Sequence, residues 1–219
     1  MREIPVLFRG PMVRAILEGR KTQTRRPVKG WALEWLQPGM FTPEYVALPS
    51  NHASPFGFAG DQLWVRETWG VGTRPDPYEG WVDGIEYRAD CHYLDDHDLL
   101  PLNRVTPPDD VDLDTYAGKW RPSIHMPRWA SRLQLGVTGI RVERLQDMSD
   151  VDADAEGFDG DYPTRAFPEY FPGNAEDYAH LTIPQCFGRI WDALAGPGSW
   201  DANPWVWVVE FEPLEAGRE

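Results

Sequence analysis

Proline limits what this chain can fold into more than any other feature of its sequence. The 219 residues include 21 prolines, and few long segments between them show the apolar spacing of a helix. Proline lacks a backbone donor, so it is tolerated in turns, at strand edges and in the first turn of a helix, but not inside long helices. The sequence therefore predicts strands, loops and short helices rather than a helical bundle.

Strands are predicted where apolar residues alternate with polar ones or form short runs. The segments with this pattern are residues 4–8, 62–69, 132–145 and 205–211. In the second of them, Leu63, Val65 and Glu67 share the apolar face. A carboxylate on that face needs a partner such as an arginine, because an unpaired buried charge is strongly destabilising.

Short helices are predicted between these strands. They cover residues 11–18, one turn near 32–36, a segment that starts at the capping residue Ser149, and residues 184–194. A loop is predicted over 70–77. The order of elements indicates an α+β fold around a small antiparallel barrel. We expect one domain over residues 1–219, with insertions near 70–130 and 158–184.

The net charge of −14 argues against general binding to nucleic-acid backbones. The charge is unevenly distributed, however. Residues 1–30 contain eight basic and two acidic residues, a balance of +6, so the other 189 residues carry −20. A local positive region on an acidic protein suits a nucleoside-like ligand or a short stretch of RNA, and makes long duplex DNA a poor partner.

Other features of the sequence bear on location and metals. No apolar run approaches the length of a membrane span, and no secretory pattern is found at the start, so we expect a cytoplasmic protein without membrane contact. Cys91 and Cys186 lack metal-binding spacing. The group Cys91, His92, Asp95, Asp96, His97 and Asp98 is better interpreted as an acidic loop than as a metal site. No metal or other cofactor is expected.

The segment 19–26 contains the strongest candidates for catalytic residues. Lys21 and Thr24 lie among arginines, and nearby cations lower the pKa of a lysine. A neutral lysine can take the proton of a threonine hydroxyl and make it a nucleophile. The alternative is that Lys21 binds an anion and Thr24 is an ordinary strand residue, and the spacing alone favours this alternative.

Aromatic and basic residues elsewhere form a second candidate set. Flat rings stack on bases, and arginine binds phosphates and carbonyl groups. In so tryptophan-rich a chain most of these residues belong to the core, and one or two are expected to line a pocket. The set consists of Trp64, Arg66, Trp69, Trp120, Arg121, Arg128 and Trp129.

Together these segments resemble the ASCH superfamily, whose members have a PUA-like β-barrel. The matching pieces are residues 16–25, 60–67, 145–156 and 206–211. The chain is most similar to the longer ASCH proteins common in phages and prophages, which carry a loop like residues 120–129. The resemblance implies a small antiparallel or mixed barrel flanked by short helices, with loop insertions.

One small bacterial member of the superfamily is an amidohydrolase that removes the acetyl group from the exocyclic amine of acetylcytidine. By motif, the resemblance implies catalytic roles for Lys21 as base, Thr24 as nucleophile and Glu156 as acid/base or orienting group. Glu67 is the rival for the site carboxylate. The expected substrate-binding residues are Arg20, Arg25, Arg26, Trp64, Arg66, Glu67 and Arg128.

Two other functions stay open. Some members of the superfamily are linked to RNA binding or RNA cleavage. The chain is therefore either a hydrolase acting on the amide of an acylated or otherwise modified pyrimidine nucleoside, or a module that binds RNA or a modified nucleotide, with or without ribonuclease activity.

Overall fold

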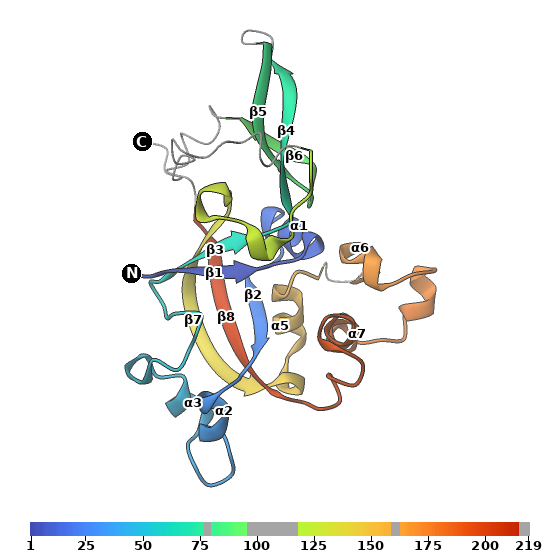
Figure 1. Ribbon diagram of the computed structural model, residues 1–219. Helices are drawn as coiled ribbons and strands as arrows, with labels where there is room; N and C mark the ends of the chain where they lie inside the picture. The colour runs from blue at the N-terminus through green and yellow to red at the C-terminus, as the bar shows by residue number, and fades with distance from the viewer. Residues whose placement is uncertain (77–79, 96–117, 159–162, 215–219) are drawn as a thin grey trace. The chain divides into compact units, whose positions relative to one another are not determined.

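The computed structural model describes residues 1–76, 80–95, 118–158 and 163–214 (Figure 1). The chain divides into two compact units, each built from segments that are distant in sequence. Unit 1 comprises Met1–Arg14, Gln62–Gly136 and Pro213–Glu219, and unit 2 comprises Ala15–Asp61 and Val137–Glu212. The single-domain organisation with two insertions stays a prediction, and parts of both expected insertions lie outside the described residues.

Strands and short helices make up the regular structure. The strands are β1 (Glu3–Leu7), β2 (Gln23–Pro27), β3 (Gln62–Arg66), β4 (Trp69–Asp76), β5 (Gly80–Tyr87), β6 (His92–Asp95), β7 (Gln134–Arg144) and β8 (Trp205–Pro213). The described α-helices are α1 (Gly10–Leu17), α2 (Trp31–Trp35), α3 (Pro43–Val46), α5 (Asp150–Ala155), α6 (Pro163–Ala166) and α7 (Ile183–Ala195). Short 3₁₀ helices lie at Pro49–Asn51, Ser123–His125, Arg128–Ala130, Leu145–Asp147, Pro168–Tyr170 and Ala175–Tyr178.

Five strands form a mixed sheet in the order β1-β3-β7-β8-β2. β1 pairs with β3 in parallel, whereas β3 pairs with the start of β7, and β2 with β8, in antiparallel fashion. The α+β class is therefore confirmed. The expected closed barrel is wrong for the described residues, because the hydrogen-bonded order ends at β1 on one side and at β2 on the other, which makes an open sheet.

A second sheet contains β4, β5 and β6, all in unit 1. Its first strand contradicts the predicted loop over 70–77. Gly72 lowers the strand propensity of the segment, but its missing side chain makes room for a neighbour: a Cβ there would lie 2.6 Å from the Glu86 carboxyl. Trp69 and Tyr87 are fully buried at the base of this hairpin, and this burial outweighs the weak local propensity.

In unit 1, β3 confirms the predicted alternation. Leu63 and Val65 are buried, and Glu67 is only 1% exposed. Arg132 donates from Nε to Glu67 Oε1 at 2.9 Å and from NH2 to Oε2 at 3.0 Å. The buried carboxylate therefore has the arginine partner that its position requires.

In unit 2, α5 packs on β2 and against α7, as Figure 1 shows. α5 begins at the predicted cap, since the Ser149 hydroxyl accepts from the Asp152 backbone and the Asp152 side chain accepts from the Ser149 backbone. Helix α5 therefore lies against β2, with α7 packed against α5. Within the described ranges, no helix has the length and apolar character needed to cross a membrane.

Candidate functional site

The way in which helix α1 ends determines the position of Lys21. Gly19 adopts φ +74°, and its backbone N–H donates to the Ile16 carbonyl at 3.0 Å, so the helix ends there as predicted. The chain then turns into β2, and Lys21 forms an isolated antiparallel bridge with Glu156, the residue that ends α5. The basic segment and the Glu156 carboxylate, 135 residues apart, therefore meet inside unit 2.

The Lys21 ammonium group is buried and fully hydrogen-bonded. Its Nζ donates to Glu156 Oε2 at 2.5 Å, to the Gln23 carbonyl at 2.7 Å and to the Glu156 carbonyl at 3.0 Å. A lysine has three N–H donors, so these three acceptors use all of them. The side chains of Lys21 and Glu156 are 2% and 4% exposed.

Arg25 binds the other oxygen of the same carboxylate. Its NH1 donates to Glu156 Oε1 at 3.2 Å, and its NH2 donates to Glu143 Oε1 at 2.6 Å. The Arg25 side chain is completely buried. Lys21 and Arg25 thus share the Glu156 carboxylate, and Glu143 is a second acidic partner of Arg25. The buried Arg25 side chain has no exposed surface with which to bind a substrate.

Burial lowers the pKa of the Lys21 ammonium group. The charge and hydrogen bond of Glu156 oppose this effect, and the positive charges of Arg26 and Arg25 add to it. The sequence predicts the same direction from the nearby arginines, but the larger cause is loss of contact with water. The 2.5 Å contact with Glu156 nevertheless identifies Lys21 as the cation of an ion pair.

A second layer of charges extends this network toward the surface. Asp152 accepts from Gln23 Nε2 at 3.2 Å and from Arg141 NH2 at 2.5 Å. Burial alone would raise the pKa of Asp152, but hydrogen bonds from Ser149 and Gln23, together with the charge of Arg141, lower it. Arg141 also binds Glu210. We call Lys21, Gln23, Arg25, Arg141, Glu143, Asp152, Glu156 and Glu210 the charged network.

Thr24 lies on the other face of β2. Side chains alternate along a strand, and in the β2–β8 register Gln23 is opposite Glu210 and Thr24 is opposite Val209. Residues directly opposite each other share a face. Gln23 and Glu210 therefore lie on the side of the charged network, with Lys21, and Thr24 lies on the reverse side. The structure does not bring the Thr24 hydroxyl to the Lys21 amine.

A cavity of about 530 Å³ lies on the Thr24 face of the strand. Arg26, two residues after Thr24, lines it and is paired in register with Trp207. The lining also includes Lys29, Trp31, Pro55 and Phe56, all in unit 2. Among the described residues that line it, two are cations and none is acidic. In a chain of net charge −14, this composition favours an anionic ligand with a flat apolar part.

Arg26 is the predicted ligand-binding residue that lines this cavity. Burial lowers the pKa of its guanidinium group, and the charge of Glu156 partly offsets this. An arginine still keeps its charge at neutral pH. Arg20 instead donates to the Gly157 carbonyl and to Glu18, and so helps to hold the end of α5.

Three further predicted residues meet in unit 1. The guanidinium groups of Arg66 and Arg128 lie 5.5 and 5.9 Å from the centre of the Trp64 ring, within cation–π range. Arg128 also pairs with Glu3, and Arg66 donates to the Ile124 carbonyl. Glu67, the rival carboxylate, is bound by Arg132, so Glu156 is the carboxylate that pairs with Lys21.

Sequence reasoning missed the cavity and most of the charged network. The alternation of Lys21, Gln23 and Arg25 could have indicated that these three share a face, which would have required buried acids opposite them. Glu143, in the predicted strand 132–145, was the available signal. Nothing in the sequence links Arg26 to Phe56 and Trp207, which come from three separate segments.

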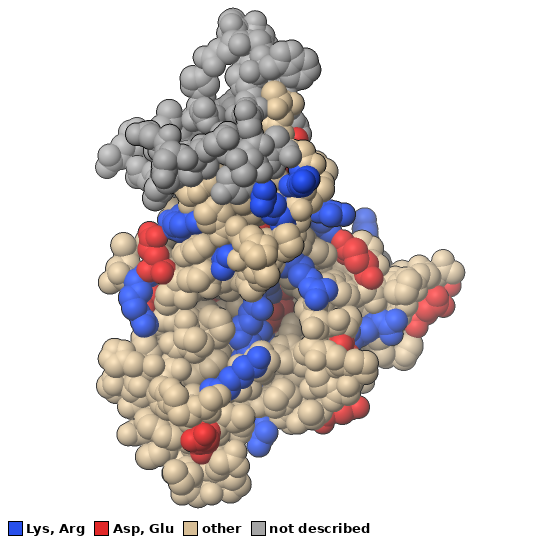
Figure 2. All heavy atoms as spheres, viewed as in Figure 1, with Lys and Arg blue, Asp and Glu red and all other residues tan. Residues whose placement is uncertain are grey.

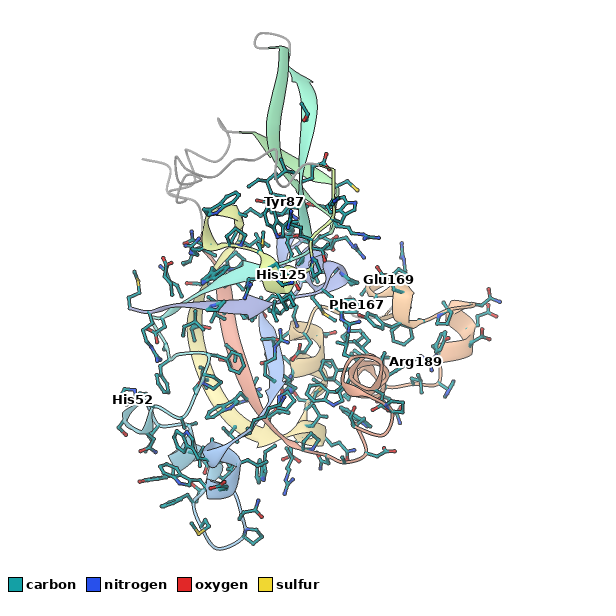
Figure 3. The ribbon with its side chains drawn as sticks, viewed as in Figure 1. His52, Tyr87, His125, Phe167, Glu169 and Arg189 are labelled. Carbon is teal, nitrogen blue, oxygen red and sulfur yellow. The ribbon has the colours of Figure 1, made fainter. Side chains whose placement is uncertain are left out.

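Gly157 offers a test of how tightly this region is packed. Its φ is +107°, and a Cβ there would lie 2.9 Å from Ala15 Cβ and 3.1 Å from Lys21 Cβ; it would also crowd Phe167, labelled in Figure 3. Gly157→Ala is expected to lower the free energy of unfolding by about 3 kcal/mol, from backbone strain plus overlap.

The matched control for this substitution is Gly196→Ala. Gly196 has a similar φ of +112° but no atom within 4 Å of the added Cβ, so only the strain applies. Urea denaturation of both variants measures the difference. Equal losses of stability in the two variants would contradict the close packing around Lys21.

Within the ranges that the structure describes, no group of three His, Cys, Asp or Glu side chains is placed to hold a metal ion. Of the predicted acidic loop, residues 92–95 form strand β6, and Asp96, His97 and Asp98 lie outside the described residues.

Comparison with known proteins identifies no relative of this chain. No protein-family model, no curated protein and no solved structure matches the chain.

Proposed function

We propose that this protein is an ASCH-type module that binds a nucleotide in the cavity beside Arg26 and Trp207. The observation that carries the proposal is the lining itself: two cations and three aromatic residues around about 530 Å³. This volume lies in the range of small-molecule sites. The aromatic residues suit a base, and the two cations suit a phosphate.

The charged network has a supporting role in this proposal. Because Lys21, Arg25 and Glu156 are satisfied within unit 2, they hold β2 against α5 and leave the opposite face for the ligand. Arg26 and Thr24 alternate with these residues along the same strand, so any shift of β2 would misplace the cavity wall. The resemblance implies that Lys21, Thr24 and Glu156 share a site, and the contact between two of them, Lys21 and Glu156, supports the proposed ASCH assignment.

The proposal predicts that cytidine 5′-monophosphate binds and that Lys29→Glu weakens binding about tenfold or more. Lys29 is exposed at the cavity, so its replacement spares the core, and reversing one charge near a phosphate costs about 1–2 kcal/mol. Isothermal titration calorimetry measures both affinities.

Lys119→Glu is the matched control, since it makes the same charge change at an exposed lysine of unit 1 that is outside the cavity lining. It is expected to leave the affinity within about twofold of the wild type. Absence of nucleotide binding by the wild type, or equal losses in the two variants, would refute the proposal.

A second candidate is the acetylcytidine-type amidohydrolase. The observation that favours it is the buried contact between Lys21 and Glu156, with the lowered pKa of Lys21. The position of Thr24 weighs against the hydrolase. A catalytic base usually contacts its nucleophile directly, but Thr24 lies on the face of β2 opposite to Lys21. Incubation with a panel of acylated cytidines tests it: turnover that Thr24→Val abolishes supports the hydrolase, and no turnover by the wild type removes it.

A further inference from the structure

Exposed apolar side chains are concentrated in one segment of unit 2, which contains α2, α3 and the loops that adjoin them. Thirteen large apolar side chains are exposed in the described part of the chain, and six of them lie within residues 31–48. Single exposed apolar residues are ordinary, but such a concentration is typical of an interaction surface. We call these six residues the apolar patch: Trp31, Leu33, Met40, Phe41, Tyr45 and Leu48.

The rings of the apolar patch are held in place by one another. Phe41 and Tyr45 stack at 4.7 Å between ring centres, with their planes 14° apart. The half-buried Trp35 contacts Phe41 at 5.0 Å and Tyr45 at 6.1 Å, and it also contacts Trp31 at 4.8 Å. The Thr42 hydroxyl caps α3 by accepting from the Tyr45 backbone at 3.2 Å. The surface is therefore preformed, and a preformed surface loses little conformational entropy when a partner covers it.

The area of the apolar patch fits the apolar part of a dimer interface. Its side chains are between 36% and 58% exposed. At roughly 200 Å² for a large side chain, the six residues therefore present on the order of 500 Å² of apolar surface. A stable interface covers about 800 Å² of each partner, and somewhat more than half of that area is apolar. A second copy of this chain that covered the patch would bury the apolar area that a stable homodimer needs.

The charges around the apolar patch favour a second copy as the partner. In Figure 2 the region that α2 and α3 occupy in Figure 1 is mostly free of charged atoms. A charged partner would lose hydration there without gaining an opposite charge, whereas the same patch on a second copy is uncharged. The exposed Lys29 precedes α2, and the exposed Glu34 and Glu44 lie on α2 and α3. Because a two-fold axis pairs a surface with itself, each copy brings both signs of charge to the border of the interface.

We propose that two copies of this protein associate through their apolar patches, across a two-fold axis, to form a homodimer. Phe41 stacks on Tyr45 and contacts Trp35, so it belongs to the ring cluster of the patch and lies near the axis in the dimer. Trp31 also lines the cavity, so the interface adjoins the cavity. The inference does not depend on the proposed function, because the association needs no nucleotide.

Sedimentation velocity over a series of protein concentrations tests this inference. The chain has a mass of 25.0 kDa. We expect a species of twice that mass, with a dissociation constant of about 10 μM or tighter. Raising the salt concentration from about 0.05 M to about 0.5 M should tighten the association a few-fold, because salt screens the repulsion between two acidic copies. Weakening by salt, or a protein that stays monomeric at about 200 μM, would overturn the inference.

Phe41→Glu and Phe41→Lys locate the interface. Each variant alone brings two like charges together near the axis and should weaken the association at least about tenfold. A mixture of the two variants should restore dimers, because opposite charges then meet there. Leu194→Glu is the matched control, since Leu194 is 38% exposed near the end of α7 and outside the patch. It should leave the dissociation constant within about twofold of the wild type. Thermal unfolding verifies that each variant is folded.

The outcomes of these experiments decide between surfaces. Association that is unchanged by Phe41→Glu, or that falls equally with Leu194→Glu, would place the contact elsewhere and overturn the inference. A mixture of Phe41→Glu and Phe41→Lys that stays monomeric, although the wild type forms dimers, would overturn the two-fold arrangement. A monomeric wild type that binds cytidine 5′-monophosphate would overturn the inference and leave the proposed function intact. A dimer that binds no nucleotide would have the opposite meaning.

Discussion

Glu156→Ala is expected to lower the free energy of unfolding by about 3–5 kcal/mol. The substitution removes the carboxylate that accepts from Lys21 at 2.5 Å and from Arg25 at 3.2 Å. The side chains of these two cations are 2% and 0% exposed, so bulk water cannot replace the lost partner. Arg25 would keep its contact with Glu143 at 2.6 Å, but the buried Lys21 ammonium group would lose the carboxylate that neutralises it. Chemical denaturation at neutral pH measures the loss.

Glu210→Ala is the matched control in the same network. Glu210 pairs with Arg141, but the two side chains are 45% and 36% exposed, so water screens the pair and restores the lost hydrogen bonds. We expect a change below about 1 kcal/mol. If Glu156→Ala were as mild as Glu210→Ala, the interpretation of Lys21 as a buried cation that depends on Glu156 would be wrong.

Glu67→Ala should have an effect of similar size in unit 1, about 3–5 kcal/mol. Its carboxylate, 1% exposed, binds two nitrogens of Arg132. Burial alone would lower the pKa of Arg132, but hydrogen bonds to Glu67 and Asp90 raise it. The Arg132 guanidinium lies 4.1 Å from the ring centre of Tyr87, which is labelled in Figure 3. Removing Glu67 leaves this enclosed cation with one partly exposed carboxylate. Urea denaturation reports the change.

Two further variants test the cause of that loss. Glu3→Ala breaks the Arg128 pair, in which the side chains are 48% and 22% exposed, and should cost less than about 1 kcal/mol. The double variant Glu67→Leu with Arg132→Met replaces both charges by apolar groups and should recover most of the stability. A double variant less stable than Glu67→Ala would show that packing, rather than an unpaired charge, dominates at this position.

The sequence predicted those parts of the fold that depend on local pattern. Alternation placed Glu67 on a buried face, where a carboxylate needs a partner such as an arginine, and in the structure this partner is Arg132. Gly19 and Ser149 marked the end of one helix and the start of another, because a left-handed residue and a hydroxyl cap act through nearby backbone groups. The prediction of a loop over 70–77, where the structure has β4, failed for a non-local reason. Burial of Trp69 against other segments outweighs the weak strand propensity of the residues that follow it.

The candidate site shows where local pattern is insufficient. The resemblance singled out Lys21 and Glu156, and the structure places these two side chains in contact although 135 residues separate them. It grouped Lys21 with Thr24 by sequence distance, but alternation in β2 turns the two side chains to opposite faces. The cavity could not be predicted, because Arg26, Phe56 and Trp207 come together only when three segments fold against one another.

The most direct test of the central claim is to locate the bound nucleotide by the indole N–H signals of the tryptophans in two-dimensional nitrogen–proton NMR. Trp31→Phe and Trp207→Phe variants assign the two signals of the cavity. If a nucleotide occupies the cavity, adding cytidine 5′-monophosphate shifts the signals of Trp31 and Trp207 in a saturable way and leaves that of Trp64 in place. Saturable shifts confined to Trp64 or other tryptophans outside the cavity, with those of Trp31 and Trp207 unchanged, would contradict it.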